Sequence, residues 1–199
     1  MGMRSGLRKA VITAVALAAS AVAATAATFT GSFNLSGSAF TDPGLVVNAN
    51  PIGGPTSFNL NVGQSTTFNL FDIWTDETSV QYDDTIAQSI FASFTLTQPV
   101  ASGAVSGVTD GHWGLLQYGS LNWGGPLMLA FGNGGLLSIT LSNETFNTGL
   151  FGLFPGYHKG ATVTATATYV AAPVPVPAAG FLLAGGLGVM ALMRRRRKT

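Results

Sequence analysis

Apolar and polar residues alternate with a period of two along much of the centre of the chain. The alternation is clearest over residues 29–35, 58–62, 137–141 and 162–169, and in the last run threonines occupy the even positions. An apolar side chain on every second residue is typical of a β-strand with one buried and one solvated face. No segment between these runs has the spacing of an amphipathic helix. The central region is therefore predicted to be all-β.

Turn-forming residues separate the runs at short intervals, as expected for strands joined by tight connections. The turn signals are Asp42-Pro43-Gly44, Asn50-Pro51, Gly53-Gly54-Pro55, Asp110-Gly111, Gly124-Gly125-Pro126 and Asn133-Gly134-Gly135. Many short strands with such turns predict an antiparallel β-sandwich or jelly-roll-like ectodomain over residues 28–170. A β-helix or other solenoid is the alternative. Phe-Asn-Leu occurs at 33–35, 58–60 and 68–70, but the unequal spacing gives no fixed repeat.

The charged residues divide the chain into three parts. Of its 199 residues, 47% are hydrophobic and only 9% are charged. Lys159 is the only lysine or arginine between Lys9 and Arg194, whereas all eight acidic residues lie in that interval. A region with a single lysine cannot neutralise a phosphate backbone, so nucleic acid is excluded as its partner. The chain has no cysteine, which excludes disulfides and thiolate metal sites.

The N-terminal end has the layout of a secretory signal peptide, assigned to residues 1–27. A basic stretch ending at Lys9 is followed by a run of small and apolar residues over 11–27. Ala24-Thr25-Ala26 offers signal peptidase the small residues that it requires, and Thr25-Ala26-Ala27 does so one residue later. A retained membrane helix and a buried core helix are the alternatives. Export is the expectation.

The C-terminal end has the features of a membrane stop. Residues 178–193 carry no charge, and as a helix they would be about 24 Å long, slightly less than the ~30 Å hydrocarbon layer of a bilayer. The side chains of Arg194, Arg195, Arg196 and Arg197 can reach the interface and hold the basic tail, residues 194–199, in the cytoplasm. Prolines stiffen residues 171–177 into an extended spacer.

The same end resembles a known sorting signal. Val174-Pro175-Val176-Pro177-Ala178, the apolar stretch and the closing arginines together are similar to the tail of PEP-CTERM bacterial proteins, most closely the variant that reads Val-Pro-Leu-Pro-Ala. This chain departs from that variant at Val176, where leucine is usual. The resemblance implies recognition by an exosortase-type transpeptidase and transfer from the inner membrane to the cell surface or extracellular matrix, where exopolysaccharide is a partner. An uncut single-span anchor is the alternative.

Five of the eight acidic residues lie within one short stretch: Asp72, Asp76, Glu77, Asp83 and Asp84. Carboxylate oxygens on loops suit Ca²⁺, which takes six to eight oxygen ligands in loose geometry. These residues are a candidate calcium site, although they lack the regular spacing of a known calcium loop. Solvated acids are the alternative. A carboxylate pair of a glycosidase is the less favoured chemical interpretation, because nothing in the sequence sets the required separation.

Other catalytic groups are missing from the sequence. It contains no Gly-x-Ser-x-Gly elbow, and His112 and His158 stand apart from any metal-binding pattern, as surface or turn residues do. Trp113, Tyr118 and Trp123 follow the Asp110-Gly111 turn and are candidate sugar-stacking residues. For the two tryptophans, burial in the core is the favoured expectation.

These features predict an exported, non-catalytic surface or matrix protein that carries a C-terminal sorting signal and is a candidate glycan binder, with no cofactor other than calcium. The abundance of Ser, Thr, Asn and Gly favours this function over a catalytic one. An exported carbohydrate-active hydrolase and a permanently membrane-anchored adhesin are the alternatives.

Overall fold

The computed structural model describes residues 26–52 and 57–173. Most of the predicted signal peptide, the sorting motif at 174–178, the apolar stretch and the closing arginines lie outside the described residues. Within those two ranges, no helix is both long and apolar enough to span a bilayer.

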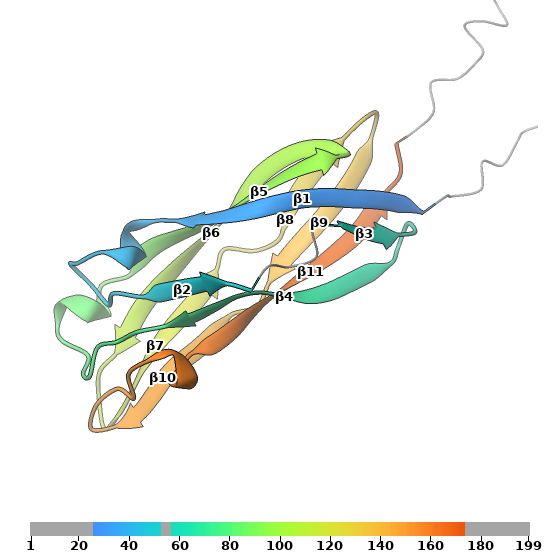
Figure 1. The fold of residues 1–199 in the computed structure, drawn as a ribbon. Coiled ribbons are helices and arrows are strands. Elements are labelled where there is room, and N and C mark those ends of the chain that lie inside the picture. The colour runs from blue at the N-terminus through green and yellow to red at the C-terminus, as the bar shows by residue number, and fades with distance from the viewer. Residues whose placement is uncertain (1–25, 53–56, 174–199) are drawn as a thin grey trace, which may run out of the picture.

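In the residues that the structure describes, eleven strands form two sheets that face each other (Figure 1). The first sheet has the order β10-β7-β6-β5-β1-β3, and its strands are β1 (Ala27–Ser36), β3 (Ser57–Leu60), β5 (Gln88–Gln98), β6 (Val100–His112), β7 (Leu116–Trp123) and β10 (Glu144–Leu150). The second has the order β2-β4-β11-β9-β8, and its strands are β2 (Asn48–Pro51), β4 (Ser65–Trp74), β8 (Leu127–Phe131), β9 (Gly135–Leu141) and β11 (Ala161–Ala171). The paired strands are antiparallel, and the predicted all-β sandwich is confirmed.

The period-two runs become strands with the expected faces. In β11 the odd-numbered residues from Val163 to Tyr169 are buried, while the threonines between them face outward. Thr166 lies between Thr67 and Thr140 in the register, and its hydroxyl is 2.8 Å from that of Thr67. The outer face is therefore held by polar cross-strand contacts, while the inner face supplies the core.

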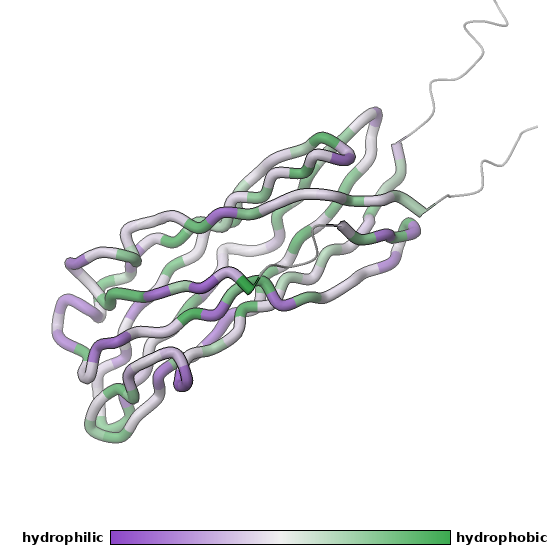
Figure 2. Tube along the Cα trace, viewed as in Figure 1, coloured by the Kyte–Doolittle hydropathy of each residue, from purple (hydrophilic) through white to green (hydrophobic). Residues whose placement is uncertain are grey.

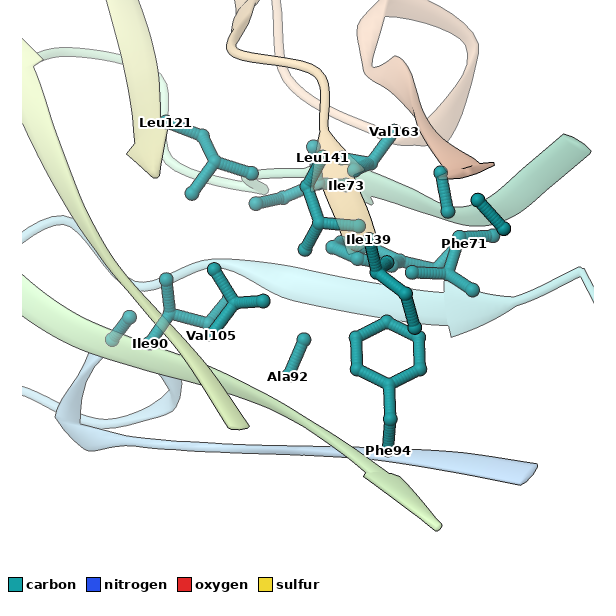
Figure 3. Packing of buried hydrophobic residues seen from close by; sticks show 14 of the residues in the cluster. Phe71, Ile73, Ile90, Ala92, Phe94, Val105, Leu121, Ile139, Leu141 and Val163 are labelled. Carbon is teal, nitrogen blue, oxygen red and sulfur yellow. The ribbon is translucent and has the colours of Figure 1, made fainter. Parts of the chain in front are cut away.

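Apolar side chains from both sheets fill the space between the layers (Figure 3). The first sheet contributes, among others, Ile90, Ala92, Phe94 and Val105. The second contributes, among others, Phe71, Ile73, Ile139, Leu141 and Val163. Residues 27–171 supply both sheets and the apolar side chains that they bury against each other, so this segment is expected to fold by itself.

The two ends of the sandwich differ in character. At the proximal end, where β1 begins and β11 ends (Figure 1), an aromatic cluster of Phe29, Phe58, Phe131 and Tyr169 closes the core. The opposite end, called here the distal end, carries three short 3-10 helices: η1 (Ser38–Phe40), η2 (Asp83–Thr85) and η3 (Tyr157–Lys159). The β6–β7 connection also lies there (Figure 1).

Candidate functional site

A pocket of about 400 Å³ lies among the loops of the distal end. Its lining includes five carboxylates, contributed by Asp42, Asp76, Glu77, Asp83 and Asp84, and we call it the acidic pocket. Four of these residues belong to the predicted cluster. Asp42 precedes them by more than thirty positions and joins them because the loop after η1 packs beside the loop after β4.

Hydrogen bonds from the surrounding backbone fix the carboxylates. Glu77 Oε1 accepts the Val46 N–H at 2.8 Å, and Asp84 Oδ2 accepts the Gln81 N–H at 2.6 Å. Asp84 is only 3% exposed, so its carboxyl group is held inside the protein rather than in solvent. Fixed carboxyl groups near one another produce a local negative potential that a cation would relieve.

The pKa of Glu77 is raised above its ordinary value of 4.5, first by burial and then by the nearby charges of Asp84 and Asp42. A hydrogen bond between the Glu77 and Asp84 side chains acts in the same direction. The bond from the Val46 N–H opposes the rise, because it stabilises the ionised carboxylate.

The pocket has the oxygen chemistry that calcium prefers. Nevertheless, in the part of the chain that the structure describes, no group of three or more His, Asp or Glu side chains is arranged to hold a metal ion. The pocket also brings carboxylates together, which a glycosidase needs. However, its two groups must flank a sugar at roughly 5 to 10 Å, whereas Asp84 is only 3% exposed and its Oδ2 is occupied by the Gln81 N–H.

Asp72 does not join the other predicted calcium ligands. It lies within β4, where it pairs with Thr162, and accepts hydrogen bonds from Tyr157 Oη at 2.6 Å and Thr162 Oγ1 at 2.5 Å. The hydrogen bond to Asp72 is the main reason that the pKa of Tyr157 is raised. Asp72 is part of a strand, whereas the later acidic residues lie on the loop that leaves the sheet. Its closeness to them in sequence therefore gave a wrong prediction.

The three candidate sugar-stacking residues lie in different environments. Trp123 is partly buried against the core and meets the Phe71 ring edge-on at a centroid distance of 6.4 Å, which agrees with the predicted core packing. Trp113 is 75% exposed, and the prediction of burial is wrong for it. The alternation ends with β6 at His112, and Trp113 begins the connection that follows.

Tyr118 stacks on His112, with ring centroids 4.3 Å apart and planes 18° from parallel; we call these two residues the ring pair. They are opposite each other in the β6–β7 register, on the outer face of the sheet. His112 Nε2 lies 3.6 Å from Asp110 Oδ2, and the Ser120 hydroxyl donates to Asp110 Oδ1. Aromatic surface flanked by hydrogen-bonding groups suits a sugar ring. His158, in η3, is exposed as predicted.

Buried polar side chains organise the distal loops, and sequence reasoning missed them. Asn147 is fully buried; its Oδ1 accepts the Thr75 N–H at 2.9 Å, and its Nδ2 donates to the carbonyls of Phe154 and Gly156 at 2.5 and 3.1 Å. Gln117 Oε1 accepts the Val80 N–H at 2.7 Å. These bonds tie the loop after β4 and the loop after β10 to the first sheet, so both loops are held in place at the distal end.

The raised pKa of Glu77 predicts a specific pH dependence. The folded protein binds this proton more tightly than the unfolded chain, so the stabilisation is complete below pH 4.5 and is lost as the pH rises through the folded pKa. Glu77→Gln keeps an acceptor for the Val46 N–H and removes the charge. We expect its urea midpoint to gain on the wild type between about pH 4 and about pH 7. Glu144→Gln, outside the pocket, is the control, and an equal gain there would contradict the assignment.

The chain matches no protein-family model, and comparison with curated proteins and with solved structures likewise gives no match.

Proposed function

We propose that this protein is an exported, non-catalytic surface or matrix protein that is delivered by its C-terminal tail and binds glycan at its distal end. The observation that carries the proposal is that the two termini of the described segment and the candidate sites lie at opposite ends of the sandwich. Its first and last strands begin and end at the proximal end, while the ring pair and the acidic pocket are near the opposite end (Figure 1). Attachment at one end leaves the other free to bind.

The tail supports the delivery part of the proposal. β11 ends at Ala171, and the sorting motif that resembles PEP-CTERM tails begins only three residues later, at Val174. Such a short connection would keep the folded domain close to a membrane enzyme that cuts there. Intact-mass measurement on protein recovered from the cell surface tests this step. A mass that still includes residues 179–199 would favour the permanently anchored adhesin.

The ring pair supports the glycan part. It offers flat apolar area, and Asp110, Ser120 and Asn122 supply hydrogen-bonding groups next to it. Sugars present both kinds of surface, with apolar C–H faces and hydroxyl edges. The acidic pocket lies at the same end and has the oxygen chemistry that calcium prefers, but no three of its described carboxylates are arranged to hold a metal ion, so the proposal does not depend on calcium.

Binding of the segment 27–173 to a glycan array, in calcium and in a chelator, tests the proposed function. For a glycan that binds, we expect Tyr118→Ala to weaken affinity about fivefold, because loss of one stacked ring costs about 1 kcal/mol. Tyr118→Phe keeps the ring and should retain most of the affinity. Phe91→Ala, which removes an exposed ring from the outer face of neighbouring β5, is the control. The proposal fails if no glycan binds, or if Tyr118→Ala binds as well as the wild type. Turnover of a bound glycan would favour the hydrolase.

A further inference from the structure

Six large apolar side chains are exposed together at the distal end, on two loops and on the strand residues next to them, Leu116 of β7 and Leu150 of β10. We call this surface the apolar tip; it consists of Trp113, Leu115, Leu116, Leu150, Phe151 and Phe154. Trp113 is 75% and Phe151 76% exposed, and each of the others is more than half exposed. Figure 2 shows the corresponding hydrophobic stretch where β10 leads toward η3. Its three aromatic rings alone expose on the order of 400 Å², which is within the range of the largest apolar patch on a soluble monomer, a patch that is often functional.

The two loops are joined into one surface by backbone bonds. Leu150 pairs with Leu116 at the end of the β7–β10 ladder, and the Phe151 N–H donates to the Leu115 carbonyl at 2.8 Å. The Phe154 N–H donates to the Asn147 carbonyl at 3.0 Å. The exposed rings therefore project from a continuous, hydrogen-bonded scaffold.

Holding Phe151 in this position has a conformational cost. Its φ is 58°, in the left-handed region that bulky residues rarely adopt. Such strain persists only where the surrounding structure enforces it, and it occurs preferentially at functional positions. Here the enforced conformation leaves the ring in solvent rather than in the core.

The charges around the tip indicate the kind of partner. Residues 111–116 and 148–160 contain no Asp or Glu, and Lys159 Nζ lies 5.9 Å from the centre of the Phe154 ring. A lysine beside Trp, Phe and Leu is the composition found at membrane interfaces. The acidic pocket belongs to the neighbouring loop, because the Leu153 N–H donates to the Thr78 carbonyl at 2.9 Å. Those carboxylates would repel anionic lipids, so the apolar tip suits a bilayer without net charge.

The size of the tip points the same way. A stable protein interface takes about 800 Å² from each partner, roughly twice the area that the three aromatic rings of the tip expose. Lipids can rearrange around short projecting apolar loops, whereas a protein partner would need a surface of complementary shape.

We propose that the apolar tip inserts into the interface of a zwitterionic lipid bilayer, at the end of the domain opposite its C-terminal attachment. This inference is independent of the glycan proposal, because it uses different side chains and a different ligand. The domain would then connect its attachment point to a second, lipid-covered surface.

Tryptophan fluorescence of the segment 27–173 with phosphatidylcholine vesicles tests the inference. Trp113 is the exposed tryptophan in the described part of the chain, whereas Trp74 and Trp123 are partly buried. We expect a blue shift of the emission on adding vesicles, and quenching by brominated acyl chains. Phe151→Asn should weaken partitioning about tenfold or more, because it removes one large apolar side chain. Asparagine tolerates the left-handed φ, so this variant is expected to fold.

Val100→Asn is the matched control, since Val100 is 81% exposed at the start of β6, away from the tip. It should partition like the wild type. The inference is overturned if vesicles produce no blue shift, if both variants weaken binding equally, or if phosphatidylglycerol vesicles bind more tightly than phosphatidylcholine. It is also overturned if the segment self-associates without lipid and Phe151→Asn abolishes that association, because a second copy would then be the occupant.

Discussion

Replacing Phe29 with alanine is expected to lower the free energy of unfolding of the sandwich by about 4 kcal/mol. Phe29 is fully buried and is the centre of the proximal aromatic cluster. Its ring lies 5.4 Å from that of Phe58, 5.7 Å from that of Phe131 and 5.2 Å from that of Tyr169. These rings come from both sheets, so the cavity left by alanine would lie between the layers and remove contacts that join them.

Urea denaturation of the segment 27–173, followed by circular dichroism, measures this effect. Phe91→Ala is the matched control: Phe91 is 39% exposed on the outer face of β5, and its removal should cost less than about 1 kcal/mol. Similar losses for the two variants would mean that the proximal cluster is not part of the cooperative core.

The strands were predictable because each is encoded locally. In β11 the alternation of threonine with apolar residues is sufficient to assign both faces, and the buried set from Val163 to Tyr169 follows directly. The same holds for β9, where Leu137, Ile139 and Leu141 are buried. Period-two patterning requires no knowledge of the neighbouring strand, so a single sequence carries the information.

The acidic pocket was only partly predictable, because it depends on which loops meet. Asp76, Glu77, Asp83 and Asp84 are close in sequence and stay together. Asp42 is added by contact between two loops that are distant in sequence, and alternation gives no information on such contacts. Asp72 is absent from the pocket for the opposite reason. It lies inside β4, and the end of that strand separates it from acidic residues that are near it in the chain.

Asn147 could not have been found from the alternation, because it lies where the alternation fails. The β7–β10 register shifts between Phe146 and Gly149, and Phe146 and Asn147 are both buried as a result. Asn147 adopts a φ of 53°, which asparagine tolerates better than most residues. A bulge of this kind turns a side chain that regular pleating would expose toward the interior.

Replacing Asn147 with alanine is therefore expected to cost about 3 kcal/mol of stability. The variant leaves the Thr75 N–H and the carbonyls of Phe154 and Gly156 without their hydrogen-bond partner. It also places alanine at a positive φ, where the Cβ is strained and no side-chain hydrogen bond offsets the strain. Asn147→Gly loses the same hydrogen bonds but tolerates the backbone angle, so it should be about 1 kcal/mol more stable than Asn147→Ala. Asn147→Asp keeps the acceptor for Thr75 but brings a carboxylate oxygen against two carbonyls, so its stability should fall as the carboxyl group ionises.

Chemical denaturation of the three variants measures these differences, and hydrogen exchange locates them. We expect the amides of Thr75, Phe154 and Gly156 to exchange faster in Asn147→Gly than in the wild type, while the amides of β11 keep their order of protection. Because Thr75 Oγ1 also donates to the Val46 carbonyl at 2.7 Å, and the Val46 N–H binds Glu77, the same substitution should loosen the acidic pocket as well as the apolar tip. Uniform acceleration across all strands would show that Asn147 supports the whole sandwich rather than holding its distal loops in place.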